Sequence, residues 1–505
     1  MKHHTIVTIL GFLGLTIIAQ VSTSQQTWRT VAPMNTPRFY FSMVPLQNGT
    51  VLAIGGEDVN DNPIGSCELY DPASGIWTYT GSLAVPRGRG CAVVLSSGKV
   101  AVFGGQVSAS VAQTDQIEVY DPATKTWSSG GHLLLARQNE TATYVNDSSI
   151  VIIGGLSADG TTASCEVYNS LTMSSRAIAS MHQNRHDHMS LLLSNSNNIL
   201  VAGGRDGGSG SRYFSECEMY DQENDVWTVM TPMQQARIMG VLAQFPDGSI
   251  LAAGGRNTPS TSAPGSELLD TASLQWTTIS PMLQPCTVSG NVMLPDARYL
   301  MTGGQIGGVW SIETDNITTP TCEWYDRPNQ RWYYAPTLNL SRDKHVAVFL
   351  HQGVNNSLPS DMVMAAGGLV GIPIVDSFQH MTTVNPYITN TVEVLDVSPQ
   401  AMGYYIAHQP TTAGVGPQTA STQSHFEVRY DADFNSILFF ESAQSTVGLL
   451  EVYDSRGARV VYLQSNLGPG PYEIRASQLS LQSGVYFVRM TFDNLVQTAK
   501  LVIAR

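Results

Sequence analysis

The sequence predicts an all-β protein built from seven copies of one unit, and three recurring features predict it. The first is a diglycine that occurs seven times, at intervals of 49, 50, 49, 51, 49 and 64 residues. The second is a glutamate and the third a tryptophan, each at a fixed place in the unit. A period near fifty residues is typical of a stacked or radial repeat. The diglycines are Gly55-Gly56, Gly104-Gly105, Gly154-Gly155, Gly203-Gly204, Gly254-Gly255, Gly303-Gly304 and Gly367-Gly368.

The glutamate lies in the pattern Glu-x-Tyr-Asp or a close variant of it. It is present in every unit, as Glu68, Glu118, Glu166, Glu218, Glu267, Glu323 and Glu393. A tryptophan follows seven residues after the Tyr or Leu position, as Trp77, Trp127, Trp227, Trp276 and Trp332. Ser175 replaces it in the third unit, and the last unit has no tryptophan after its glutamate.

Each unit divides into four short strands. The first strand ends in a turn such as Asn48-Gly49, a dipeptide that suits a tight hairpin. The second strand is an apolar run into the diglycine, as in residues 51–56. The third carries the glutamate and the fourth carries the tryptophan. Glycine at the diglycine permits close backbone approach, and the Tyr and Trp rings are large plates that pack one sheet against the next.

These motifs at this spacing resemble kelch repeats over residues 26–399. The resemblance implies a seven-bladed kelch β-propeller of the galactose-oxidase-like superfamily, with one unit in each blade. The last blade lacks its tryptophan, and the segment 26–33 around Trp28 is similar to a fourth strand. We therefore expect the N-terminal segment to close the ring as the outer strand of blade seven, which removes a free sheet edge. Blade seven is irregular, with an insertion near residues 354–361 and a long segment over 369–391.

The C-terminal part has a different composition. Residues 400–424 are rich in Pro, Gly, Thr, Ser and Gln, which is typical of a linker, and residues 425–505 show alternating strand patterns. The stretches 449–457, 481–489 and 497–505 resemble the type A C-terminal sorting domain of type IX secretion cargo, which is a small immunoglobulin-like β-sandwich. In place of the usual opening Pro-Asn-Pro stands His425-Phe426-Glu427. The resemblance implies export by the type IX secretion machinery. The alternative is an accessory sandwich that packs on the propeller.

Residues 1–24 have the features of a signal peptide, with Lys2 before an apolar run from Ile6 to Ala19. That run is too short to span a bilayer comfortably, and no later one is long enough, so we expect no membrane span. The net charge of −14, from 26 basic and 40 acidic residues, disfavours nucleic acid as a partner. We expect a monomer that is secreted, at the outer-membrane surface or in the extracellular space.

An arginine precedes the innermost strand in six of the seven units, and Cys286 holds this place in the sixth. A lone buried carboxylate is costly, so each arginine is expected to pair with a buried glutamate or carbonyl. The neighbours of the arginines differ between units and are better candidates for a binding site at the pore mouth. These candidates are Tyr40, Arg89, Asn139, Glu140, His186, Asp187, His188, Lys344 and His345.

His186-Asp187-His188 has metal-binding residue types, but on a strand the two histidines would share one face and the aspartate would point away. A polar pore lining is the favoured interpretation, so we expect no metal and no cofactor. Cysteines at equivalent places in different blades are too far apart for disulfides. Phosphate-loop, Gly-x-Ser-x-Gly and His-Glu-x-x-His motifs are absent, and no catalytic residue is assigned.

Three functions remain open at this stage. The favoured one is a non-catalytic module that binds a glycan or a protein, followed by an adhesin or matrix protein. An enzyme acting on carbohydrate is third. Copper radical oxidases resembling galactose oxidase are disfavoured because the chain has no Tyr-His pair. A sialic-acid isomerase would need an arginine and an acid/base pair, which Arg89, Glu140 and His188 could supply.

Overall fold

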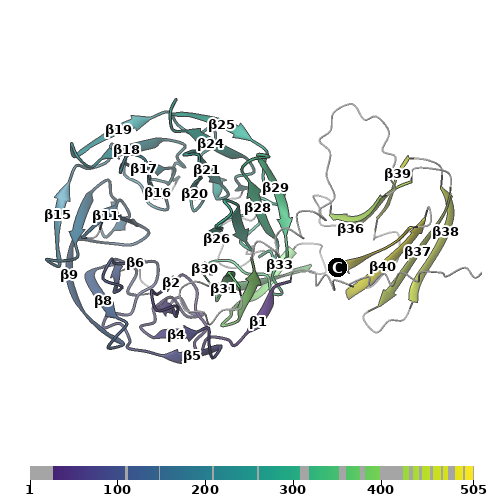
Figure 1. The fold of residues 1–505 in the computed structure, drawn as a ribbon, viewed down its shortest axis with the longest axis horizontal. Helices are drawn as coiled ribbons and strands as arrows, with labels where there is room; N and C mark the ends of the chain where they lie inside the picture. The colour runs from purple at the N-terminus through teal and green to yellow at the C-terminus, as the bar shows by residue number, and fades with distance from the viewer. Residues whose placement is uncertain are drawn as a thin grey trace, which may run out of the picture.

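The computed structural model of the protein contains seven four-stranded antiparallel sheets placed radially around one axis, as Figure 1 shows. This confirms the seven-bladed propeller. The structure describes residues 27–108, 112–146, 148–207, 210–258, 261–306, 318–351, 360–375 and 381–397 of this part of the chain. The predicted signal peptide at 1–24 and the linker at 400–424 lie outside the described residues.

Six blades are each formed from one continuous stretch of the chain. Blade one contains β2 (Ser42–Pro45), β3 (Val51–Ile54), β4 (Cys67–Asp71) and β5 (Ile76–Tyr79). Blade two contains β6 (Cys91–Val94), β7 (Val100–Phe103), β8 (Thr114–Asp121) and β9 (Thr126–Arg137). Blade three contains β10 (Thr141–Asn146), β11 (Ser149–Ile153), β14 (Cys165–Asn169) and β15 (Ser174–Ile178). Blade four contains β16 (Met189–Leu192), β17 (Ile199–Ala202), β18 (Cys217–Asp221) and β19 (Val226–Met230). Blade five contains β20 (Val241–Gln244), β21 (Ile250–Ala253), β24 (Ser266–Asp270) and β25 (Gln275–Ile279). Blade six contains β26 (Gly290–Met293), β27 (Tyr299–Thr302), β28 (Cys322–Asp326) and β29 (Arg331–Ala335).

The seventh blade combines strands from the two ends of the propeller. It contains β30 (Val346–Leu350), β31 (Met362–Ala366) and β34 (Val392–Asp396), and β1 (Arg29–Val31) is its outermost strand. β1 runs antiparallel to β34, with Arg29 opposite Val394. Trp28, which precedes β1, is buried among residues of blades six and seven, and its indole Nε1 donates to the carbonyl of Pro336 at 2.7 Å. The N-terminal segment therefore supplies the tryptophan that the last repeat lacks.

Small two-stranded sheets extend from some of the blades. They are β12 (Leu156–Ser157) with β13 (Gly160–Thr161), β22 (Arg256–Thr258) with β23 (Thr261–Ser262), and β32 (Leu369–Val375) with β33 (Met381–Ile388). The last pair accounts for the long segment predicted after the seventh diglycine. The insertion predicted near residues 354–361 falls mainly outside the described residues.

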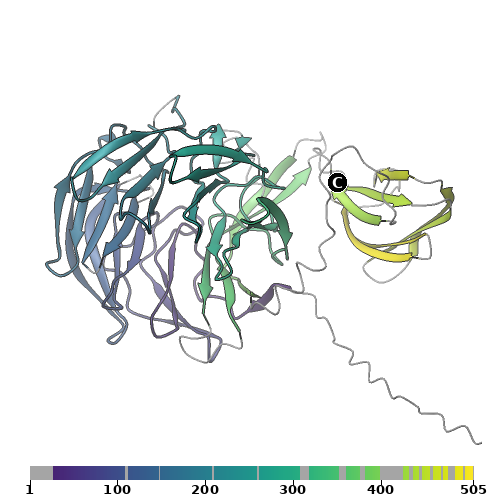
Figure 2. The ribbon, with the colours of Figure 1, turned by 45° about the horizontal axis from the view of Figure 1, so that its top comes forward.

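The core lies between the blades because the second strand of each blade is buried on both faces. β3, β7, β17, β21 and β31 are buried along their whole length. The repeated Tyr and Trp pack beside each other, with ring centroids 5.2 Å apart for Tyr70 and Trp77. In Figure 2 the four strands of a blade lie side by side from the axis to the rim. The six cysteines are free thiols.

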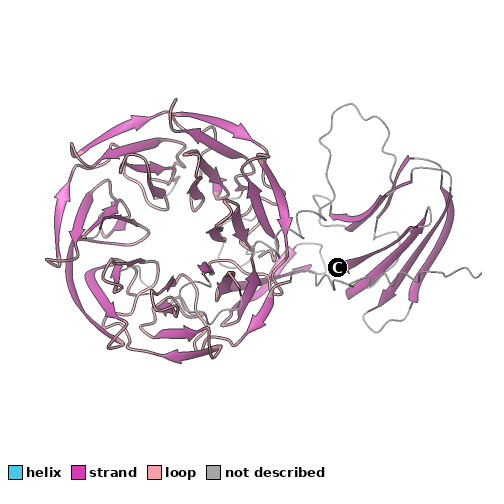
Figure 3. Cartoon of the chain, in the orientation of Figure 1, coloured by secondary structure: helices cyan, strands magenta, loops and turns pink. Residues whose placement is uncertain are grey.

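The C-terminal residues form two further sheets. One has the order β35 (His425–Tyr430), β36 (Ser436–Ser442) and β39 (Gly470–Arg475). The other has the order β38 (Arg459–Leu467), β37 (Thr446–Asp454), β40 (Gly484–Phe492) and β41 (Leu495–Ile503). The immunoglobulin-like arrangement of these sheets stays a prediction. In Figure 3 the residues that are coloured are strands and loops. In the part of the chain that the structure describes, no helix is long and apolar enough to cross a membrane.

Candidate functional site

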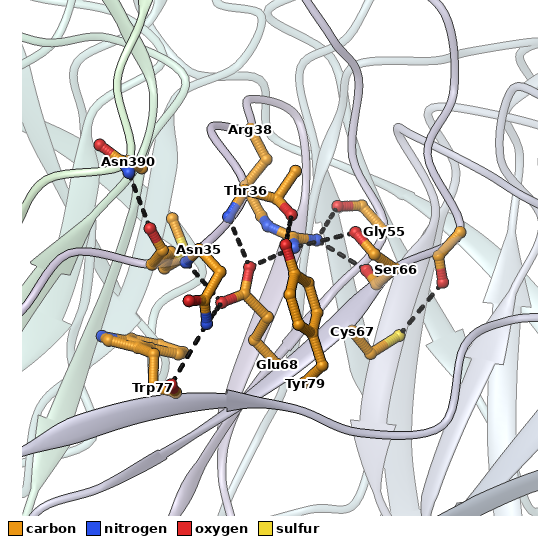
Figure 4. Close-up of polar contacts among 12 residues, drawn as sticks. Asn35, Thr36, Arg38, Gly55, Ser66, Cys67, Glu68, Trp77, Tyr79 and Asn390 are labelled. Atoms are coloured by element: carbon orange, nitrogen blue, oxygen red, sulfur yellow. Dashed lines mark hydrogen bonds and ion pairs between the residues drawn. The ribbon is translucent and has the colours of Figure 1, made fainter.

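Six buried ion pairs hold the turns that lead into the innermost strands. Figure 4 shows the pair of blade one, where Arg38 Nη2 lies 2.8 Å from Glu68 Oε1. Arg38 Nη1 also donates to the carbonyls of Gly55 (2.6 Å) and Ser66 (2.8 Å). The other pairs are Arg87–Glu118, Arg137–Glu166, Arg185–Glu218, Arg237–Glu267 and Arg342–Glu393, with N–O distances of 2.7 to 2.8 Å. The structural role predicted for the repeated arginines is thereby confirmed.

Two residues after each of the six arginines, and two residues after Cys286 in blade six, the backbone adopts a left-handed conformation, and these seven residues form a ring around the axis. We call them the axial ring: Tyr40, Arg89, Asn139, Asp187, Met239, Val288 and Lys344, with φ between 47° and 57°. Hydrogen bonds join six of the seven neighbouring pairs, each from the N–H of one blade to the carbonyl of the preceding blade. For example, Arg89 N donates to Tyr40 O at 3.0 Å and Met239 N donates to Asp187 O at 2.9 Å.

On one side of the axial ring, blades seven, one and two place two cations beside the aromatic side chain of Tyr40. The Arg89 guanidinium lies 4.3 Å from the centroid of the Tyr40 ring, and Lys344 Nζ lies 5.5 Å from it. Glu57 accepts from both Nε (2.7 Å) and Nη2 (3.1 Å) of Arg89, so the guanidinium plane is fixed. Lys344 Nζ lies 3.5 Å from Asp343 Oδ2.

These charges act on each other across the ring. Burial raises the pKa of Tyr40, and the positive charges of Lys344 and Arg89 oppose that shift. The carboxylate of Asp187, in blade four, also raises the pKa of Tyr40, which places blades one and four within electrostatic reach. Burial would lower the pKa of Arg89, but the hydrogen bond to Glu57 and the nearby Tyr40 outweigh it and the pKa is raised. Arg89 therefore stays charged at every relevant pH.

The opposite side of the ring carries a second set of fixed charges. Arg205 Nε donates to Asp187 Oδ2 at 2.9 Å, and His186 Nε2 lies 3.5 Å from the same oxygen. His186 Nδ1 lies 3.1 Å from Thr161 Oγ1, and burial lowers the pKa of this histidine. Arg256, from blade five, hydrogen-bonds to Gln305 and is within electrostatic reach of Tyr40 and Asp343. Titratable groups of blades one, two, four, five and seven thus lie close enough to shift one another's pKa values.

Three of the candidate residues lie apart from this ring. Glu140, His188 and His345 come three residues after the repeated arginines, are buried, and pack against the diglycine of the preceding blade. His188 Nε2 lies 3.0 Å from Thr141 Oγ1, and His345 Nε2 lies 2.9 Å from Thr302 Oγ1. Burial lowers the pKa of both histidines well below its usual value.

Glu140 is unusual because neither carboxylate oxygen has a hydrogen-bond partner elsewhere among the described residues. Burial raises its pKa to about 8, against the nearby N–H of its own main chain and the charges of Arg137 and Arg87. A side chain on Gly104 would place its Cβ 2.1 Å from Glu140 Oε1, so only glycine fits there. The carboxyl group is therefore held between blades two and three.

The expectation that His186 and His188 share a strand face is wrong. Asp187 has a φ of 55°, which breaks the two-residue alternation of a strand, so the two imidazoles contact different residues. Within the described ranges, no group of three or more His, Cys, Asp or Glu side chains could hold a metal ion.

Sequence reasoning missed several members of the site. Met239 and Val288 lie at the same spacing as Tyr40 and Arg89, but their apolar side chains carry no charge or hydrogen-bonding group that would mark them as binding candidates. Glu57, Arg205 and Arg256 each follow a diglycine directly, and their bridge partners lie next to the axial ring. These residues could have been found by searching for positions of the repeat at which the residue type differs between blades. The position directly after the diglycine varies in this way, as does the position two residues after the arginine.

Two parts of the chain match known domain families. Residues 41–241 match the KLHDC2/KLHL20/DRC7 Kelch-repeats domain, and residues 433–504 match the Secretion system C-terminal sorting domain. The protein therefore combines a seven-bladed kelch β-propeller with a type IX sorting domain. The sorting domain indicates secretion to the cell surface or the extracellular space.

Similarity to individual proteins is more limited. An F-box/kelch-repeat protein of Arabidopsis thaliana is 31% identical over 97 residues, which are 19% of this chain and 25% of that protein. The chain thus spans about a quarter of the length of this curated relative. Among solved structures, a novel fungal alcohol oxidase of the AA5 family, in complex with copper, is similar in fold. Its TM-score is 0.57 at 12% identity, over 95% of this chain and 100% of that one.

Proposed function

We propose that this secreted kelch propeller is a non-catalytic binding module that takes a glycan at the axial ring. The observation that carries the proposal is the set of fixed charges on two sides of the axial ring: Arg89, held by Glu57 beside Tyr40, and on the opposite side Asp187, held by Arg205. Sugar hydroxyl groups both donate and accept, so paired carboxylates and guanidinium groups suit them. An aromatic ring supplies an apolar surface for the sugar ring.

Preorganisation supports binding at this place. Glu57 engages Nε and one Nη of Arg89, and no described residue accepts a hydrogen bond from the second Nη. Arg89 is 21% exposed and Arg205 is 18% exposed, whereas their carboxylate partners are buried. A ligand would therefore meet donors whose orientation is already fixed, which reduces the entropy lost on binding.

The arrangement supports binding more than catalysis. Glu57 and Asp187 are bound to arginines and serve as fixed acceptors. Glu140 and His188, which an acid/base mechanism with Arg89 would use, pack between blades beside the diglycines and make no described contact with Arg89. The likeness to a copper enzyme extends to the fold alone at 12% identity.

The test is a glycan array, with neutral, uronic and sialylated glycans, probed with residues 26–505. We expect saturable binding that falls at least tenfold in Arg89→Ala and in Tyr40→Ala. Arg176→Ala is the matched control, because Arg176 is an exposed arginine on the outer strand β15. Folded protein that binds no glycan, or binding that Arg176→Ala weakens as much as Arg89→Ala, would contradict the proposal. In the first case a protein ligand becomes the hypothesis to test.

A further inference from the structure

Blade six lacks the arginine that the other six blades bury. Cys286 occupies its place, and the carboxylate of Glu323 is left without the guanidinium that its counterparts bind. Glu323 is only 2% exposed. An unpaired buried carboxylate is costly, so this blade departs from the rule that the rest of the propeller follows.

The remaining parts of the arginine site are still in place in blade six. Glu323 accepts hydrogen bonds from the main-chain N–H groups of Leu283, at 2.8 Å, and Gln284. Glu393 of blade seven accepts the same pair of bonds from Asn339 and Leu340. The two blades therefore hold their carboxylates in the same way, and only one has a cation.

Blade seven shows which groups hold the arginine at the equivalent position. Arg342 donates through Nη1 to the carbonyls of Gly367 and Thr391, both at 3.0 Å. Its Nη2 donates to Thr391 Oγ1 at 2.8 Å and to Glu393 at 2.7 Å. Gly303 and Thr321 of blade six occupy the places of Gly367 and Thr391 in the repeat.

A cavity lies where the arginine would be. Its lining includes Cys286, Gly303, Thr321 and Glu323, together with the side chains of Met282 and Met301. Its volume is about 10 Å³. That is room for about one water without rearrangement. Methionine is flexible and adapts to irregular gaps, so the two methionines allow a somewhat larger occupant.

We propose that blade six holds a binding site for a free guanidinium-type cation, in the place that an arginine side chain fills in the other blades. The carboxylate of Glu323 supplies the charge, and the carbonyls of Gly303 and Thr321 accept the remaining N–H groups. Six arginines in the same molecule show that these acceptors match a planar, delocalised cation.

Titration of Glu323 gives the site a pH dependence. Burial raises its pKa to about 7, against the hydrogen bonds from Leu283 and Gln284. The titratable group that lines the cavity beside it is the thiol of Cys286, whose pKa burial raises to about 12. This thiol stays neutral at pH 8, so at that pH the carboxylate is the charge that a cation meets.

The experiment is calorimetric titration of the chain with guanidinium chloride at millimolar concentration and pH 8, with sodium chloride as the reference. We expect one site per chain, and binding at least tenfold weaker at pH 5.5, where Glu323 is protonated. Urea has the shape without the charge, and tetramethylammonium has the charge without the N–H donors. Neither should bind, and saturable binding of either one with similar affinity would overturn the proposal.

Variants separate the site from general effects of the cation. Cys286→Ser keeps the cavity and should bind as the natural chain does, whereas Cys286→Arg fills the cavity and Glu323→Gln removes the charge. Both of these should lose binding at least tenfold. Arg342→Ala opens the equivalent space in blade seven and should raise the stoichiometry from one to two. No binding to the natural chain, or binding that survives in both Cys286→Arg and Glu323→Gln, would overturn the proposal. The pH comparison needs no variant, so the test holds even if a variant does not fold.

Discussion

Replacing Glu140 with glutamine should remove a large pH dependence from the stability of the propeller. Glu140 is 4% exposed, and neither of its buried carboxylate oxygens has a hydrogen-bond partner elsewhere in the part of the chain that the structure describes. Burial raises its pKa from 4.5 to about 8. Each pKa unit corresponds to about 1.4 kcal/mol. Burial therefore destabilises the ionised form of Glu140 relative to the neutral form by about 5 kcal/mol.

The sign follows from the direction of the shift. Because the pKa is higher in the folded state, Glu140 stabilises the fold fully below the unfolded-state pKa. This contribution is lost as the pH rises through the folded-state pKa. The natural chain should therefore lose about 4 kcal/mol of free energy of unfolding between pH 4.5 and pH 8 through this one group. Glutamine has nearly the same shape and does not titrate, so the variant should not show this loss.

The assay is urea unfolding at pH 5, 6, 7, 8 and 9, followed by tryptophan fluorescence. The informative quantity is the difference in free energy of unfolding between Glu140→Gln and the natural chain at each pH. Other titrating groups, Glu323 among them, are present in both proteins and cancel in this difference. The buried glutamine amide, which lacks a hydrogen-bond partner, lowers the stability of the variant by about 1 to 3 kcal/mol at every pH. Two parallel stability curves would refute the reasoning, because the carboxyl group would then not be held as a buried, unpaired acid.

Three further substitutions test the scaffold. Cys286→Arg should abolish the loss of stability, about 3 kcal/mol, that Glu323 causes as the pH rises from 4.5 through 7, measured by urea unfolding across that range. Trp28→Ala should cost about 3 to 5 kcal/mol, because it empties a buried position at the seam of the ring; an unchanged urea midpoint would contradict this. Arg38→Met should cost about 3 to 5 kcal/mol by leaving Glu68 charged and buried. The double variant Arg38→Met/Glu68→Gln should recover part of that loss, and a larger loss in the double variant would argue against a charge effect.

The blades could be predicted from the sequence because the residues that build them repeat. Only glycine tolerates the backbone of the diglycine, where φ is 58° at Gly55 and 106° at Gly56 and a Cβ would meet neighbouring atoms at 2.5 and 2.8 Å. The glutamate and the arginine repeat for an equally local reason, since each buried charge needs the other. Because these requirements recur from blade to blade, the residues that meet them recur at a regular spacing in the sequence.

The candidate site could be predicted only in part, because it depends on backbone conformations that the residue types do not reveal. Tyr40, Arg89 and Lys344 adopt a left-handed conformation that is uncommon outside glycine, asparagine and aspartate. Strand alternation therefore fails at this point, which is why His186 and His188 do not share a face. The separation of Glu140 from Arg89 has the same origin, since the turn at the ring directs the next residue into the space between blades.

The division between scaffold and ring explains how one fold can carry many different binding surfaces. Main-chain hydrogen bonds join six of the seven neighbouring pairs of the axial ring, and buried arginines hold the preceding turns in six blades, so neither depends on the ring side chains. The ring side chains can then differ in every blade with little effect on the fold. Val288 shows the limit of this freedom, because a β-branched residue at a φ of 47° is strained. It lies in the blade that also lacks the arginine, so blade six combines a strained ring residue with an unfilled scaffold position. Repetition thus secures the fold at the buried positions, whereas the side chains of the axial ring can differ between blades.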